Sequence, residues 1–166
     1  MAVSASGQDG SRGSRNMKLV SHIPLGGMKA ANGSATAGFE ALGRNTGDVV
    51  LDQGRNRPFV FVARKGDVPG VVAINISDES KPVQVGEWNS PSEVADLISF
   101  KSGSNFFLIA THPSSGATVL EVTDPDEGQF DIVATIEVEG GFHHGFAYRH
   151  SNGRSYFFGT GGGNIF

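Results

Sequence analysis

Short apolar segments recur along this chain at a nearly constant interval. Asp48, Asp96 and His144 mark equivalent points of three successive units, because the spacing from the first to the second equals that from the second to the third. We call this spacing the repeat interval, and it also separates Val85 from Val133. Each complete unit contains four short apolar segments bounded by turn residues, which predicts four antiparallel strands. Units of about 45–50 residues with four strands are typical of β-propeller blades. A parallel β-helix would show much shorter rungs, and a sandwich has no reason to keep a fixed interval.

One segment of each unit is rich in aromatic residues, and it is predicted to be a buried strand. These segments are residues 57–63, 104–110 and 154–159, and each follows a tight turn that contains Asn or Gly. Asn and Gly favour such turns because they tolerate the positive φ that short hairpins need. A large ring buries about 150–250 Å², so these positions are expected to lock neighbouring blades together. The residues expected in this core are Phe59, Phe61, Phe106, Phe107, Tyr156, Phe157 and Phe158.

We therefore expect an all-β fold: a β-propeller of four-stranded antiparallel blades that is incomplete in this chain. No segment shows the apolar spacing of an amphipathic helix. The length of 166 residues suits one propeller domain, residues 17–166, after a flexible polar tail. The expected parts are the tail (1–16), an N-terminal closing outer strand (17–27), a loop insertion (28–47), two blades (48–93 and 94–141) and a partial blade (142–166).

The expected number of blades leaves the ring open. About 2.5 blades cannot close a ring, because propellers have roughly 4–8 blades. We therefore expect either that the natural protein continues beyond Phe166 or that something else covers the open ends. The open blade edges are expected to pair with the missing C-terminal part or with another chain, because unpaired strand edges bind further strands.

Composition excludes several classes of site and partner. The chain has no cysteine, which excludes disulfides, iron–sulfur clusters, thiolate zinc sites and a cysteine nucleophile. A net charge of −4 argues against a nucleic-acid partner, since such binders usually carry a basic excess. No apolar run approaches the roughly 18–20 residues of a membrane span, and the polar N-terminal segment lacks the apolar core of a signal peptide.

Residues 59–86 carry a phrase that resembles the LVIVD-repeat β-propeller family. An aliphatic strand ends in an aspartate, Asp78, and is followed by a Ser/Asp/Pro turn and a Pro-Val strand; Thr123, Asp124 and Pro125 keep the turn in the next unit. The resemblance covers roughly residues 17–166. It implies a propeller fold, a non-enzymatic binding or scaffold role through protein–protein contacts, and a periplasmic, extracellular or cell-surface location. It says little about activity.

Four residues form the best candidate for chemistry: Asp48, Asp96, His143 and His144. Equivalent positions of a propeller lie around the central channel at one depth, so residues from three blades would converge there. Carboxylates with neutral imidazole suit a divalent transition metal. The alternative function is therefore a metal-dependent enzyme with a channel-mouth site of Asp48, Asp96 and His144. In the other interpretation, the aspartates bind backbone amides at the strand starts, the histidines are polar channel-mouth residues, and no cofactor is present.

Three further motifs are interpreted as turns. Residues 124–128 lack the full spacing of a calcium loop, and the glycines of residues 159–163 lack the lysine and helix of a phosphate-binding loop. Ser114, Ser115 and His112 lack the elbow that surrounds a nucleophilic serine. Because no pair of catalytic groups has a persuasive spacing, the sequence favours a binding or scaffold module over an enzyme.

Overall fold

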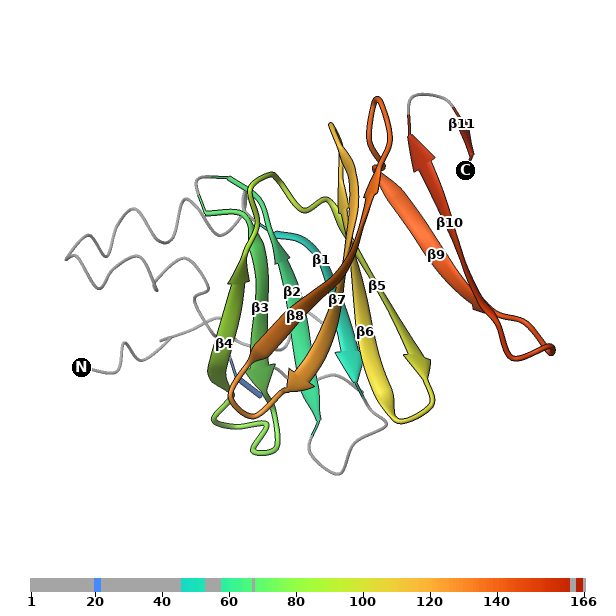
Figure 1. The fold of residues 1–166 in the computed structure, drawn as a ribbon. Helices are drawn as coiled ribbons and strands as arrows, with labels where there is room; N and C mark the ends of the chain where they lie inside the picture. Colours follow the sequence, from blue (N-terminus) through green and yellow to red (C-terminus); the bar gives the residue numbers. More distant parts are fainter. Residues whose placement is uncertain (1–19, 22–45, 53–57, 67, 162–163, 166) are drawn as a thin grey trace, which may run out of the picture.

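The chain folds into three antiparallel β-sheets (Figure 1). The computed structural model describes residues 20–21, 46–52, 58–66, 68–161 and 164–165. Within these ranges there are eleven strands and no helix, so the predicted all-β fold is confirmed. It follows that the described residues contain no helix long and apolar enough to cross a membrane.

The strands of each sheet follow one another in chain order, so neighbouring strands of a sheet are also consecutive in the sequence. The first sheet contains β1 (Thr46–Asp52), β2 (Phe59–Arg64), β3 (Gly70–Asn75) and β4 (Val83–Asn89). The second sheet contains β5 (Asp96–Ser102), β6 (Asn105–His112), β7 (Gly116–Asp124) and β8 (Gln129–Glu137). The third sheet contains β9 (His144–Arg149), β10 (Ser155–Gly161) and β11 (Asn164–Ile165).

The first two strands of the first and second sheets pair in the same register when they are offset by one repeat interval. Val50 faces Phe61 across β1 and β2, and Ile98 faces Ile109 across β5 and β6. The outer strands also share an irregularity, since the register shifts so that Val85 in β4 and the corresponding Val133 in β8 are unmatched. A bulge bends a strand locally, so the outer strands of the two sheets bend at equivalent positions.

Glycine lets the outer parts of these two sheets approach closely. A Cβ atom added to Gly128, which has φ +61°, would lie 2.2 Å from the Cα atom of Gly86. Any side chain at this contact would force the backbones of β4 and the β7–β8 turn apart. The contact therefore fixes the spacing of the first two sheets at their outer strands.

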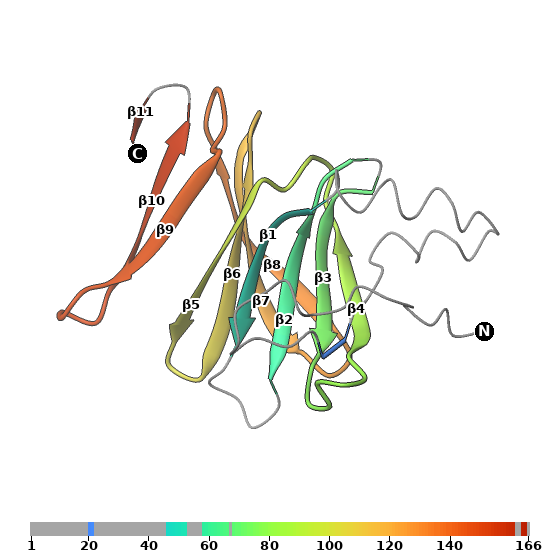
Figure 2. The same cartoon turned by 180° about the vertical axis from the view of Figure 1, so that it is seen from behind.

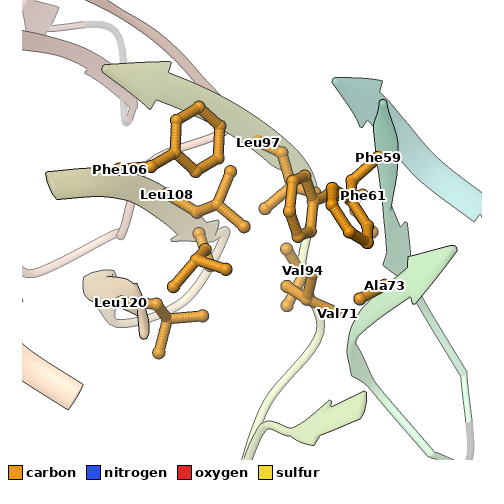
Figure 3. Close-up of a cluster of buried hydrophobic side chains, with 12 residues drawn as sticks. Phe59, Phe61, Val71, Ala73, Val94, Leu97, Phe106, Leu108 and Leu120 are labelled. Atoms are coloured by element: carbon orange, nitrogen blue, oxygen red, sulfur yellow. The ribbon is translucent and has the colours of Figure 1, made fainter. Parts of the chain in front are cut away.

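The main core lies between the first and second sheets (Figure 3). Phe61 stacks on Phe106 with ring centroids 5.5 Å apart, which joins β2 to β6. Phe59, Leu108 and Leu120 are buried around this pair. Burial of each such side chain contributes about 1.5–3 kcal/mol to stability. The burial of Phe59, Phe61 and Phe106 between the two sheets confirms the predicted packing of these residues.

A second core lies between the second and third sheets. Phe142, in the connection before β9, is buried and meets Phe157 edge to face at 5.5 Å. Ile98, Ile109 and Ala117 complete the buried cluster from the second sheet. Figure 2 shows the three sheets from behind, with β5 and β6 between the first sheet and the third.

Two of the predicted core aromatics are not buried. Tyr156 and Phe158 are 40% and 36% exposed, because they lie on the face of β10 opposite to Phe157. No sheet in the described part of the chain packs against that face.

The N-terminal predictions fall largely outside the described residues. The tail (1–16), most of the closing strand (17–27) and most of the insertion (28–47) lie in ranges that the structure does not describe. Ser21 is described, and its hydroxyl donates a hydrogen bond of 2.7 Å to the carbonyl oxygen of Glu79 in the turn after β3.

Candidate functional site

The candidate site lies where the first strands of the three sheets come together. Strand β1 contacts β5, and β5 contacts β9, so the three strands form the shared inner region of the sheets (Figure 2). Asp48 lies near the start of β1, while Asp96 and His144 are the first residues of β5 and β9. Equivalent positions therefore meet although they are far apart in the sequence.

Each aspartate binds the backbone of the next sheet. The Leu97 N–H donates to Asp48 Oδ2 at 3.2 Å, and the Gly145 N–H donates to Asp96 Oδ2 at 2.9 Å. Both bonds join residues 49 positions apart. A hydrogen bond to a charged acceptor contributes about 1.5–3 kcal/mol, so these two carboxylates fasten the first strands to one another. These bonds agree with the interpretation of the sequence in which the aspartates bind backbone amides at the strand starts.

Asp96 lies in the most perturbed electrostatic environment of this group. Burial raises the pKa of its carboxyl, the bond from the Gly145 N–H lowers it, and the neighbouring Asp48 raises it through hydrogen bonding and like charge. The charge of His144 has a smaller lowering effect on the same pKa. The net effect is a raised pKa of Asp96, because burial and the nearby carboxylate of Asp48 outweigh the bond from Gly145 and the charge of His144.

The two histidines differ in their relation to the site. His144 Nδ1 lies 3.8 Å from Asp96 Oδ2, but the His144 side chain is 78% exposed, and an exposed ion pair contributes little. The His143 side chain is also exposed, and the His143 backbone N–H donates to the Thr160 carbonyl oxygen at 2.8 Å. The structure thus brings Asp48, Asp96 and His144 together, while His143 contacts the sheet through its backbone.

The geometry favours joining the sheets over ligating a metal. Within the described ranges, no group of three or more His, Asp or Glu side chains is arranged to hold a metal ion. One oxygen of Asp48 and one of Asp96 already accept backbone N–H groups.

Comparisons with protein-family models, with curated proteins and with solved structures found no match. The geometry of the described residues is therefore the basis for assigning a function.

His112 has a buried structural role that was not predicted from the sequence. The side chain lies at the end of β6 and is 3% exposed. Its Nδ1 lies 3.0 Å from the Glu93 carbonyl oxygen and its Nε2 lies 2.9 Å from Thr118 Oγ1. The carbonyl can only accept, so Nδ1 carries the proton and Nε2 accepts from the hydroxyl.

The uncharged state of His112 follows from its surroundings. Burial lowers the pKa of His112, and its bond to Glu93 only partly opposes this effect. Both ring nitrogens are engaged, so His112 is not available as a general base for Ser114 or Ser115, which are exposed in the following turn. Arg64, one repeat interval earlier, is likewise buried and polar at the end of its strand, and the sequence indicates only that the two positions are equivalent.

A small apolar crevice lies between the second and third sheets. It has a volume of about 150 Å³, and Phe100, Ile109, Ile136 and Phe157 contribute to its wall. Ligand sites usually add a few convergent polar groups to such a lining, and Ser155 is the one side chain on this wall with an aliphatic hydroxyl. The crevice therefore has little with which to orient a substrate.

Proposed function

We propose that this chain is a non-enzymatic binding or scaffold module with the architecture of a partial LVIVD-type β-propeller. Three observations carry the proposal: the sheets share one strand order, the first two sheets pair their first two strands in the same register, and the first strands of the three sheets lie side by side. Sheets that pack in this way around their first strands are the arrangement of propeller blades.

The surface of the described part supports contact with other proteins. Large apolar side chains are exposed on one face of the third sheet: Phe146, Tyr148, Tyr156 and Phe158. Large exposed apolar patches often mark sites of contact with other proteins. The resemblance to LVIVD-repeat proteins supports a periplasmic, extracellular or cell-surface location for these contacts.

Site-specific photo-cross-linking in cells tests the binding role. A photo-reactive amino acid at Tyr148 is expected to form covalent adducts with protein, whereas the same group at Val133, on the outer strand β8, serves as the matched control. Both positions are about half exposed, at 49% and 48%. Equal labelling from both positions, or no protein adduct from Tyr148, would contradict a specific binding face on the third sheet.

A second candidate is a divalent metal held by Asp48, Asp96 and His144. The observation that favours it is the close approach of two carboxylates and an imidazole, with Asp96 Oδ2 at 3.8 Å from His144 Nδ1. Metal analysis of the purified protein tests it. A stoichiometric metal that disappears in His144→Ala would support a metal-dependent enzyme, and unchanged metal content would reject it.

A further inference from the structure

The end of β3 carries a sequence triplet that the functional site does not use. Asn75 is followed by Ile76 and Ser77. The triplet Asn-x-Ser, in which x is not Pro, is the acceptor motif for N-linked glycans in exported proteins, and it requires a surface position. The other asparagines of the described ranges have Pro, Phe or Arg two residues later: Asn89, Asn105, Asn152 and Asn164. Asn75 is therefore the one described asparagine that meets the sequence requirement.

The triplet lies where β3 ends and an exposed turn begins. Asn75 is the last residue of β3, and it pairs with Phe59 on one side and with Val83 on the other. Asn75 is partly exposed, Val83 is 57% exposed, and residues 77–81 of the turn are all exposed. A group attached to the Asn75 side chain therefore has open space beside the turn.

The Asn75 side chain is held with its nitrogen available. The Ser77 N–H donates a 2.8 Å hydrogen bond to Asn75 Oδ1, which closes an Asx turn. Because the oxygen of the amide accepts this bond, Nδ2 is the other end of the amide, and an amide nitrogen can only donate. Nδ2 donates no hydrogen bond to any residue that the structure describes. Attachment of a sugar to Nδ2 would thus leave the hydrogen bonds of the described fold intact.

We propose that Asn75 is an acceptor of N-linked glycans. The proposal rests on the exported location proposed above, because the transferases that use lipid-linked sugars act on exported chains. The donor is an oligosaccharide joined to a lipid through a diphosphate. Asn75 Nδ2 forms a bond to C1 of the first sugar as the bond from C1 to the phosphate oxygen breaks. The lipid diphosphate leaves, and a base of the transferase takes one proton from Nδ2.

Ser77 allows recognition of the motif to be separated from the fold. Its hydroxyl is exposed and makes no hydrogen bond within the described ranges, while its backbone N–H closes the Asx turn. Ser77→Ala removes the hydroxyl and keeps that N–H, so it leaves the turn in place and destroys the acceptor motif. Ser77→Thr restores a hydroxyl at the same position, so it preserves the motif.

Secretion of the full chain from eukaryotic cells, behind an export signal that is cleaved, tests the proposal. Asn32 begins another Asn-x-Ser triplet, so every variant also carries Asn32→Gln. This chain and its Ser77→Thr variant are expected to migrate more slowly on gels until peptide N-glycosidase removes the sugar. Mass spectrometry should then find residue 75 converted to aspartate. Asn75→Gln and Ser77→Ala are expected to lose the shift.

Asn105 is the matched control for exposure. It is exposed at the start of β6, but Phe107 stands two residues later, so it is expected to stay unmodified. A secreted chain with no sugar at Asn75, or a Ser77→Ala variant modified as fully as the parent chain, would overturn the proposal; circular dichroism confirms that both are folded. Sugar at Asn75 without specific adducts through Tyr148 would reject the binding role alone. Specific adducts without sugar would reject the glycosylation site alone.

Discussion

Asp96 ties the second sheet to the third by accepting a 2.9 Å hydrogen bond from the Gly145 N–H. The same bond recurs one repeat interval earlier between Asp48 and the Leu97 N–H at 3.2 Å. One short side chain at the start of a first strand thus reaches the backbone of the next first strand.

Loss of either carboxylate is expected to destabilise the fold. Asp48→Ala and Asp96→Ala should each lower the free energy of unfolding by about 1–3 kcal/mol, because a backbone N–H loses its acceptor. Chemical denaturation followed by tryptophan fluorescence measures this change. Asp131→Ala removes an exposed carboxylate from β8 and is expected to stay within about 0.5 kcal/mol of wild type. Equal losses of unfolding free energy in all three variants would show that the carboxylates of Asp48 and Asp96 do not hold neighbouring sheets together.

Asparagine at position 96 is expected to behave differently from alanine. Asp96→Asn keeps an oxygen for the Gly145 N–H and removes the repulsion from Asp48, so its stability at pH 7 should equal or exceed that of wild type. The pKa of Asp96 is raised in the fold. The contribution of the neutral Asp96 carboxyl to stability is therefore fully present below the unfolded pKa of about 3.9. It is lost as the pH rises through the folded pKa of Asp96. The advantage of Asn over Asp should grow with pH; an advantage that shrinks would refute the raised pKa.

His112 is expected to make the fold sensitive to mild acid. Burial lowers its pKa in the folded state, so the unfolded chain binds the proton first. The contribution of neutral His112 to the free energy of unfolding should be fully present above the unfolded pKa of about 6.5 and should decrease as the pH falls below it. Urea unfolding at pH 7.5 and pH 5 in wild type and His112→Gln measures the effect, which the variant should reduce. His143→Gln, at an exposed histidine, should retain the wild-type pH dependence.

The contact between Gly86 and Gly128 is expected to tolerate no side chain. Gly128 has φ +61° and Gly103 has φ +63°, but a Cβ atom at Gly103 would meet nothing within 4 Å. Gly103→Ala should therefore cost only the backbone strain of about 1–2 kcal/mol. Gly128→Ala should cost about 1–3 kcal/mol more, because two backbones must separate. Melting temperatures of the two variants give the difference, and similar values would show that the sheets do not meet there.

The strands were predictable because apolar residues alternate within them and recur at the repeat interval. The convergence of Asp48, Asp96 and His144 followed from that interval alone, since equal registers place equal positions together. The exposure of Tyr156 and Phe158 could not be predicted, because alternation shows which residues share a face and does not show whether another sheet covers it. The burial of His112 was missed because Pro113 and the two serines after it suggested a turn, while the strand β6 extends through His112.

The balance between amide binding and metal binding could not be decided from residue types. A carboxylate near the start of a strand suits either role, and the choice depends on where the next backbone N–H lies. At Asp48 and Asp96 the fold supplies that N–H from the neighbouring first strand.

The most direct test of the account is NMR of the backbone amides of Leu97 and Gly145. Packing of equivalent first strands predicts that both amides are protected from hydrogen exchange. Asp48→Ala should then abolish protection of Leu97 alone, and Asp96→Ala that of Gly145 alone. Rapid exchange of both amides in the wild-type chain, or variants that leave their rates unchanged, would show that these strands do not meet as described.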